Sequence, residues 1–186
     1  MKTVVIYESH VGSTKKYAEE IAEKVGGDVF PRKKFKFKKK LDEYDVVVYG
    51  GWVKGSQIQG LNDFLFYWDD MKEKHVIVFS CGMSFPSAES RKDMINANVL
   101  DLYHLRYYQL QGSFEFKKLD PINRFLISNS LRLMAKDDEF GASARGLADI
   151  KDNPLIVHDE KGIEKIVNVI RRLDKVVEVE PNEEEK

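Results

Sequence analysis

Five short apolar runs alternate with segments of helical periodicity, and this alternation limits the fold more than any other feature of the chain. The runs expected to be strands are residues 3–7 (TVVIY), 29–32 (VFPR), 45–49 (DVVVY), 76–80 (VIVFS) and 106–110 (RYYQL). Strands this apolar are usually covered on both faces, as in parallel sheets with helices above and below. The sequence therefore predicts an α/β fold with a doubly wound, five-stranded parallel sheet.

Helices are predicted between these strands from apolar residues spaced three or four apart. The segment 13–25 carries Tyr17, Ile21 and Val25 on one face and stops at Gly26-Gly27, a pair suited to a helix C-cap. Further helices are expected over residues 61–71, 87–102 and 163–173. Strand and helix therefore alternate through most of the chain, with no internal repeat.

The stretch 113–153 is too long for an ordinary connection between a strand and a helix. It is interpreted as an insertion between the fifth strand and the last helix. Residues 1–177 are expected to form a single domain, and the acidic segment 178–186 is expected to be a disordered tail.

Composition excludes several classes of protein. The chain is 42% hydrophobic and 33% charged, with a net charge of −1, which gives no general attraction to nucleic acid. The single cysteine, Cys81, excludes an internal disulfide framework and favours a reducing, cytoplasmic location. No apolar stretch is long enough to cross a membrane, and the four histidines show no metal-ligand spacing.

The first strand runs directly into a polar, hydroxyl-rich loop that opens the next helix. A helix N-terminus offers free backbone N–H groups and the positive end of a dipole, which together favour a phosphate. The candidate residues are Ser9, His10, Val11, Gly12, Ser13 and Thr14. The loop contains neither lysine nor arginine, so phosphate binding would rest on neutral donors.

Two further loops follow the third and fourth strands, at the strand ends where open α/β sheets hold their ligands. Their candidate binding residues are Gly51, Trp52, Val53, Lys54 and Gly55, and then Ser80, Cys81 and Gly82. The glycines permit unusual backbone angles, and Trp52 is either a stacking platform or an ordinary loop aromatic. Lys54 either favours an anionic ligand or is a solvated surface lysine. Cys81, lacking an identified basic partner, is expected to pack rather than to act as a nucleophile.

The segments YESHVGSTKKYAEEIA, YDVVVYGGWVKG and VFSCGMS resemble the FMN-binding loops of flavodoxins. The resemblance covers residues 3–112 and returns in the last helix. It implies the strand order 2-1-3-4-5 and an FMN cofactor whose phosphate lies in the first loop and whose ring lies between the other two. The stretch YYQLQGSFEFKKLDPINRFLI is similar to the insertion in the branch that includes the bacterial flavodoxin-type protoporphyrinogen oxidase.

Two functions are compatible with this resemblance. The first is an FMN-dependent oxidoreductase that acts on an apolar or porphyrinogen-type substrate, with a quinone or another electron acceptor. The second is a flavodoxin-type electron carrier with a redox partner protein and no substrate of its own. Flavodoxin carriers are typically strongly acidic, whereas this chain is near neutral.

The insertion and a basic run are the two candidate contact surfaces. A helix expected over residues 121–136 has two apolar faces, so it has a second burial partner: a homodimer mate, a peripheral membrane surface, an apolar substrate, or the rest of the insertion. The segment considered for dimer or membrane contact is 113–148. The basic run 32–40, which includes Phe35 and Phe37, is either a solvated edge or a docking patch for an acidic redox partner or an anionic lipid.

Overall fold

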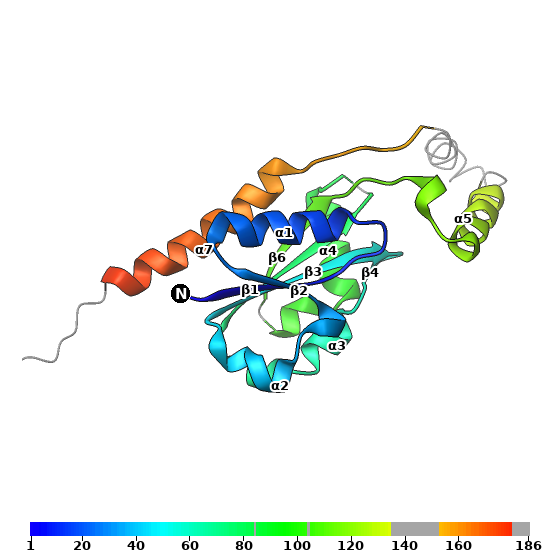
Figure 1. Ribbon diagram of the computed structural model, residues 1–186. Coiled ribbons are helices and arrows are strands. Elements are labelled where there is room, and N and C mark those ends of the chain that lie inside the picture. The colour runs from blue at the N-terminus through cyan, green and yellow to red at the C-terminus, as the bar shows by residue number, and fades with distance from the viewer. Residues whose placement is uncertain (84, 104, 135–152, 180–186) are drawn as a thin grey trace, which may run out of the picture.

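A computed structural model describes residues 1–83, 85–103, 105–134 and 153–179 (Figure 1). Its strands are β1 (Thr3–Glu8), β2 (Asp28–Pro31), β3 (Val46–Lys54), β4 (Gln57–Ile58), β5 (His75–Gly82) and β6 (Arg106–Gln111). Its α-helices are α1 (Ser13–Val25), α2 (Phe37–Lys40), α3 (Leu61–Leu65), α4 (Ala88–Ala97), α5 (Pro121–Met134) and α7 (Glu160–Val179). The insertion helix predicted over 121–136 is thus present to Met134.

The five predicted strands form one parallel sheet in the order β2-β1-β3-β5-β6. This order is the 2-1-3-4-5 arrangement expected from the sequence, so the predicted fold class is confirmed. The chain moves outward from β1 to β2 and then crosses back to β3 on the other side of β1. The order of the strands therefore reverses between β1 and β3, and ligands of such sheets bind at the carboxyl ends beside that point.

Three of the predicted elements differ clearly from the observed ones. The helix expected over 87–102 ends at Ala97 and is followed by a separate 3-10 turn at Leu100–Tyr103. The third strand continues past Tyr49 to Lys54, and its end pairs antiparallel with β4, a strand that the sequence did not indicate. The helix expected over 61–71 is broken into α3 and a short 3-10 turn at Trp68–Asp70. Its apolar side chains are nevertheless on the core side, because Leu61, Phe64 and Met71 are almost fully buried.

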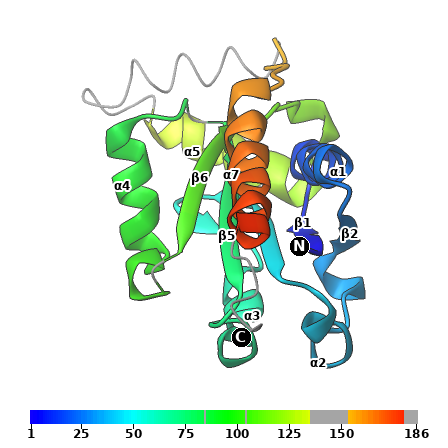
Figure 2. The same cartoon turned by 90° about the vertical axis from the view of Figure 1, so that its left-hand side faces the viewer.

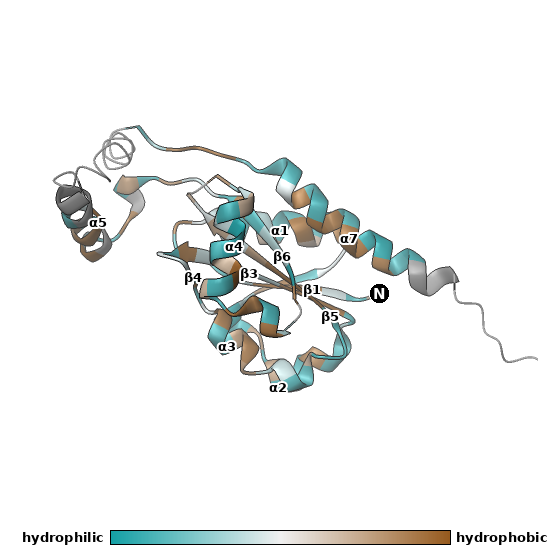
Figure 3. Cartoon of the chain, turned by 180° about the vertical axis from the view of Figure 1, so that it is seen from behind, coloured by the Kyte–Doolittle hydropathy of each residue, from teal (hydrophilic) through white to brown (hydrophobic). Residues whose placement is uncertain are grey.

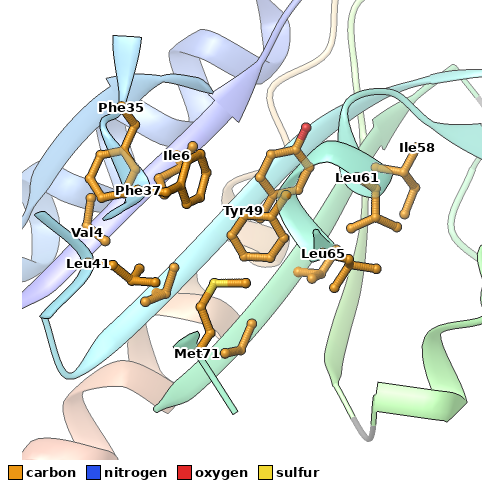
Figure 4. Close-up of a cluster of buried hydrophobic side chains, with 14 of the residues drawn as sticks. Val4, Ile6, Phe35, Phe37, Leu41, Tyr49, Ile58, Leu61, Leu65 and Met71 are labelled. Carbon is orange, nitrogen blue, oxygen red and sulfur yellow. The ribbon is translucent and has the colours of Figure 1, made fainter. Parts of the chain in front are cut away.

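Helices cover both faces of the sheet, as the apolar strands require. On one face α1 and α7 bury Tyr17, Ile21 and Ile166 against the sheet. On the other face the segments around α2, α3 and α4 contribute the cluster that Figure 4 shows, in which Tyr49 lies against Phe64 with ring centroids 4.6 Å apart. Figure 3 shows the resulting distribution, with apolar strands inside and polar residues on the outer surfaces of the helices.

The basic run folds as a short 3-10 turn at Arg32–Lys34 followed by α2. Phe35 and Phe37 point into the core and are only 5% and 7% exposed, and their rings meet edge to face at 4.9 Å. The lysines of the run lie on the outside. The aromatic residues therefore anchor the segment, and the lysines form a solvated surface.

The insertion leaves the sheet at the end of β6 and returns beside its own starting point. Phe114 and Leu155 form an antiparallel bridge with two backbone hydrogen bonds of 2.8 and 3.0 Å. Residues 135–152 of the insertion and 180–186 of the predicted tail lie outside the described residues, while the helix α7 includes 178 and 179.

Gly50 is expected to be a position where any side chain destabilises the sheet. A Cβ at residue 50 would lie 2.1 Å from the ring of its buried neighbour Phe79 on β5. We expect Gly50→Ala to lower the free energy of unfolding by about 1–3 kcal/mol, the usual effect of overpacking a core. Urea denaturation of Gly50→Ala, Phe79→Leu and the double variant measures this effect.

The double variant should be less destabilised than the sum of the two single changes, because leucine leaves room for the added methyl group. Strictly additive effects would contradict this explanation of the glycine.

Candidate functional site

A cavity of about 370 Å³ opens at the carboxyl ends of the strands, beside the reversal point between β1 and β3. Its volume falls in the range of roughly 300–1,000 Å³ that is common for ligand sites. Ten of the predicted residues line it: His10, Val11, Ser13, Thr14, Trp52, Val53, Lys54, Gly55, Cys81 and Gly82. The fold therefore brings the three predicted loops together around one space.

The N-terminus of α1 lies at this cavity with its backbone donors unpaired. The N-cap residue is Gly12, whose φ of +108° is a conformation that favours glycine, and no side chain among the described residues caps the helix. The first hydrogen bond of the helix runs from the Lys16 N–H to the Gly12 carbonyl, so the N–H groups before it have no partner within the helix. An anion is the natural partner for such a terminus.

Ser9 adds a second unpaired donor beside this helix start. Its hydroxyl oxygen is buried, and no hydrogen-bond partner exists for it in the described part of the chain. A buried hydroxyl without a partner costs free energy, so its retention needs an explanation. A ligand oxygen near the loop would satisfy it.

The carboxylate nearest to the loop in sequence is paired with an arginine. Glu8, the last residue of β1, accepts a hydrogen bond of 2.9 Å from Nε of Arg32, and Arg32 also pairs with Asp63 at 2.8 Å. This network joins the ends of β1 and β2 to α3. The positive charge of Arg32 offsets part of the repulsion that Glu8 would exert on an anion in the loop.

One wall of the cavity is aromatic. Trp52 stacks on His10 with ring centroids 4.9 Å apart and an angle of 22° between the planes. Nε2 of His10 lies 3.4 Å from a carboxylate oxygen of Asp120, which precedes α5. The wall thus connects the first loop, the end of β3 and the insertion.

Cys81 and Thr14 lie together at the cavity, both almost fully buried. Burial raises the pKa of the Cys81 thiol to about 12, and a hydrogen bond from the Thr14 side chain opposes this rise only in part. The thiolate is the nucleophilic form of cysteine. Cys81 is therefore a packing residue at neutral pH.

Four predicted residues lie outside the lining: Ser9, Gly12, Gly51 and Ser80. Ser9 and Gly12 belong to the loop itself. A Cβ at Gly51 would lie 2.4 Å from Ile58, so this glycine permits the close approach of β4. The hydroxyl of Ser80 shares a buried 2.6 Å hydrogen bond with Tyr107, on the side of the strand opposite to its neighbour Cys81.

The end of β6 and the insertion supply the remaining lining, which the sequence did not identify residue by residue. These residues are Gly112, Ser113, Phe114, Leu119, Leu126 and Ile127. Met83, which belongs to the segment VFSCGMS of the third predicted loop, also lines the cavity. The rule that all carboxyl ends of a parallel sheet share one edge could have identified Gly112 and Ser113, which follow the predicted fifth strand, but they were not among the predicted residues. The last four residues of the insertion side are apolar, and they make that side of the cavity apolar.

Hydrogen bonds hold the base of the insertion against α1. Oγ of Ser13 donates to the Ser113 carbonyl at 3.3 Å. The Tyr17 hydroxyl donates to the Gln111 carbonyl at 2.7 Å and accepts from the Asp159 N–H at 3.0 Å. The segment that enters the insertion and the segment that leaves it are thus both bonded to α1, the helix whose N-terminus faces the cavity.

Within the described residues, no group of histidine, cysteine and carboxylate side chains has the arrangement of a metal site. The same residues contain no helix of the length and hydropathy that a membrane crossing requires.

Strand order, a helix N-terminus without a side-chain cap among the described residues, and a cavity at the reversal point together define a doubly wound α/β protein with a candidate ligand site. A family model for the flavodoxin domain matches residues 4–140, and the chain belongs to that family.

Solved structures with the same fold share little sequence with this chain. Oxidised flavodoxin 1 from Bacillus cereus is 18% identical, covers 63% of this chain and 89% of its own, and has a TM-score of 0.44. A WrbA-like flavodoxin from Agrobacterium tumefaciens is 17% identical, with 60% and 83% covered and a TM-score of 0.45. A flavodoxin from the domain Archaea is also 17% identical, with 60% and 83% covered and a TM-score of 0.43. No curated protein matches the sequence.

We predict that Cys81 resists thiol reagents in the folded protein. Because the thiol is 5% exposed and its pKa is raised to about 12, iodoacetamide at pH 8 should modify it at least about a hundredfold more slowly than in the unfolded chain. Mass spectrometry over time, with and without denaturant, measures the two rates. Equal rates in the two states would show that the thiol is accessible and ionised.

Proposed function

We propose that this protein binds FMN in the cavity at the carboxyl ends of its strands and works as an FMN-dependent oxidoreductase on an apolar substrate. The single observation that carries this proposal is that one cavity has an anion-accepting helix N-terminus on one side and apolar insertion residues on the other. The first side suits a cofactor phosphate, and the second suits an apolar substrate beside the ring.

The residues present fit FMN. The N–H groups at the start of α1 and the unpaired Ser9 hydroxyl would hold the phosphate without a cationic side chain. Trp52, Gly82 and Gly112 line the space available to the ring. Bound FMN supplies an acceptor for a hydride or for electrons, which no side chain of this chain can provide.

The protein's own side chains would bind the cofactor and orient the substrate beside it. Phe114 and Leu119 would exclude water from the insertion side of the cavity, and this would strengthen the remaining polar contacts there. Lys54 brings a positive charge to the mouth, where it would favour an anionic group of the cofactor or of the substrate. A porphyrinogen-type substrate with a quinone acceptor would combine an apolar body, suited to the insertion side, with acidic groups that Lys54 would attract.

The alternative is an electron carrier without a substrate. The strand order and the anion site serve either function equally. The apolar lining from the insertion favours the oxidoreductase, because a carrier does not require an apolar space beside its cofactor. Helix α5 keeps further apolar residues exposed, with Ile122 at 71% and Phe125 at 65%, and these remain available to a redox partner, a second copy or a membrane surface.

Two serine variants separate cofactor binding from stability. We expect Ser9→Ala to weaken FMN binding by roughly tenfold to a hundredfold, the effect of losing one hydrogen bond to a charged group. It should not lower the stability of the FMN-free protein, because this hydroxyl has no partner there. Ser80→Ala should do the opposite: it loses the bond to Tyr107 and lowers stability by about 1 kcal/mol, with FMN affinity unchanged.

Calorimetric titration with FMN and urea denaturation of the FMN-free protein measure both quantities. The purified protein should also show flavin absorption at roughly 370 and 450 nm. A protein that neither carries nor takes up FMN would refute the proposal, and equal affinities of wild type and Ser9→Ala would refute the placement of the phosphate.

A second pair of variants tests the substrate side. Leu126→Ala and Phe114→Ala remove apolar surface that lines the cavity on the insertion side. We expect each to reduce kcat/KM for protoporphyrinogen oxidation with a quinone by roughly tenfold or more, because burial of a side chain of this size contributes about 1.5–3 kcal/mol. FMN affinity should stay within about threefold of wild type.

Ile122→Ala is the matched control, because this helix residue is 71% exposed and does not line the cavity. A protein that takes up FMN and accepts electrons from a reductase, but turns over no porphyrinogen, would favour the carrier.

A further inference from the structure

A groove along the outer edge of the sheet is larger than the cavity proposed for FMN. It has a volume of about 1110 Å³ and runs over β6 between α4 and α7. Figure 2 looks onto this side, with β6 visible between the two helices. Nothing in the proposed FMN function uses this groove.

The backbone of β6 has one side directed at β5 and the other directed into the groove. The Gly112 N–H donates to the Gly82 carbonyl at 2.7 Å, so the even-numbered residues face β5. The odd-numbered residues face outward. Consistent with this, the Tyr107 carbonyl accepts from Arg91 of α4 at 3.0 Å, and the Gln111 N–H donates to Asp159 at 3.1 Å.

Between the Tyr107 carbonyl and the Gln111 N–H, which both bond to side chains, lies the outward-facing backbone of Gln109. The N–H and C=O of Gln109 face outward, and within the described residues neither has a hydrogen-bond partner. Its side chain is held separately, because Oε1 of Gln109 accepts from the Ser90 hydroxyl at 3.0 Å. An unpaired edge of this kind is a template for another strand.

The groove is also basic. Arg91, Arg106, Lys161 and Lys165 line it with exposed side chains, and none of the four has an ion-pair partner within the described ranges. Asp159 and Glu160 are the carboxylates of the lining. Both oxygens of Asp159 already accept backbone N–H groups, from Gln111 and Gly162. The available charge in the groove is therefore positive.

We propose that the β6 edge binds an acidic, extended peptide segment of a partner protein by strand addition. The peptide pairs its backbone with Gln109, and its carboxylates meet the cations on both sides of the groove. A second copy of this chain suits the groove less well. The β6 strand of a second copy would also lie between its own α4 and α7, and these helices would clash with those of the first copy. The positive charges of the two grooves would also repel each other.

The probe is a labelled synthetic peptide of about seven residues in which pairs of adjacent glutamates alternate with single valines, so that both faces of the extended peptide carry carboxylates. Fluorescence anisotropy with the full-length chain should show saturable binding, and the Gln109 amide signal should shift in an NMR titration. An otherwise identical peptide with lysine in place of glutamate should not bind. The absence of binding by the acidic peptide overturns the proposal.

Gln109→Pro removes the outward N–H, a position where an edge strand accepts proline. Gln109→Ala is the matched control, because it loses the same side-chain bond to Ser90 and keeps the N–H. We expect the proline variant to bind the peptide roughly tenfold more weakly than the alanine variant. Equal binding by the two variants would show that charge alone attracts the peptide, and strand addition would be overturned.

An acidic peptide methylated at alternate backbone nitrogens tests the same bond without changing the protein. It keeps its charge and should lose roughly tenfold or more in affinity, whereas equal affinity contradicts strand addition. Lys165→Glu should weaken binding of the unmodified peptide, and unchanged binding contradicts the role of the cations. Self-association that Gln109→Pro abolishes would identify a second copy as the occupant, and the acidic partner would then be excluded.

Discussion

The position of β1 between β2 and β3 is the constraint on which the rest of the structure depends. The chain leaves the carboxyl end of β1 through α1 on one face of the sheet, and it leaves the carboxyl end of β3 toward α3 on the other face. The two connections therefore diverge at the carboxyl ends of β1 and β3. A space must remain there, and the general rule for open α/β sheets, of which flavodoxins are a standard example, places ligands in it. The N-terminus of α1, the end of β3 and the end of β5 border that space because of the strand order alone.

The part of the site that depends on this order was predictable from sequence. Apolar strands such as residues 45–49 need cover on both faces, and that requirement leads to the sheet and to the shared edge. The hydroxyl-rich loop at Ser9 to Thr14 then falls at the first strand end. What the sequence pattern could not show is the uncapped state of α1, because Ser9 and Ser13 are both common N-capping residues and neither caps this helix.

The differences between prediction and structure have local physical causes. Gly50 and Gly51 interrupt the apolar pattern and were interpreted as the start of a loop, yet their missing side chains make room for Phe79 and Ile58. Here glycine marks close packing within a strand rather than its end. Ser80 and Cys81 were both assigned to the cofactor, but neighbouring residues of a strand point to opposite faces, so only Cys81 lines the cavity. The apolar insertion residues are brought to the cavity by long-range contacts that no short motif encodes.

Asp159 joins the start of α7 to the edge of β6. Its Oδ1 accepts the Gly162 N–H and thereby caps α7, and its Oδ2 accepts the Gln111 N–H at the edge of the sheet. Its own N–H donates to Tyr17, whose hydroxyl also binds the Gln111 carbonyl. These bonds close the edge of β6 at the end near the cavity that the three predicted loops line, where the chain turns into the insertion. They do not extend to Gln109, two residues earlier, so one end of the strand is fixed beside that cavity, while the backbone of Gln109 has no hydrogen-bond partner within the described residues.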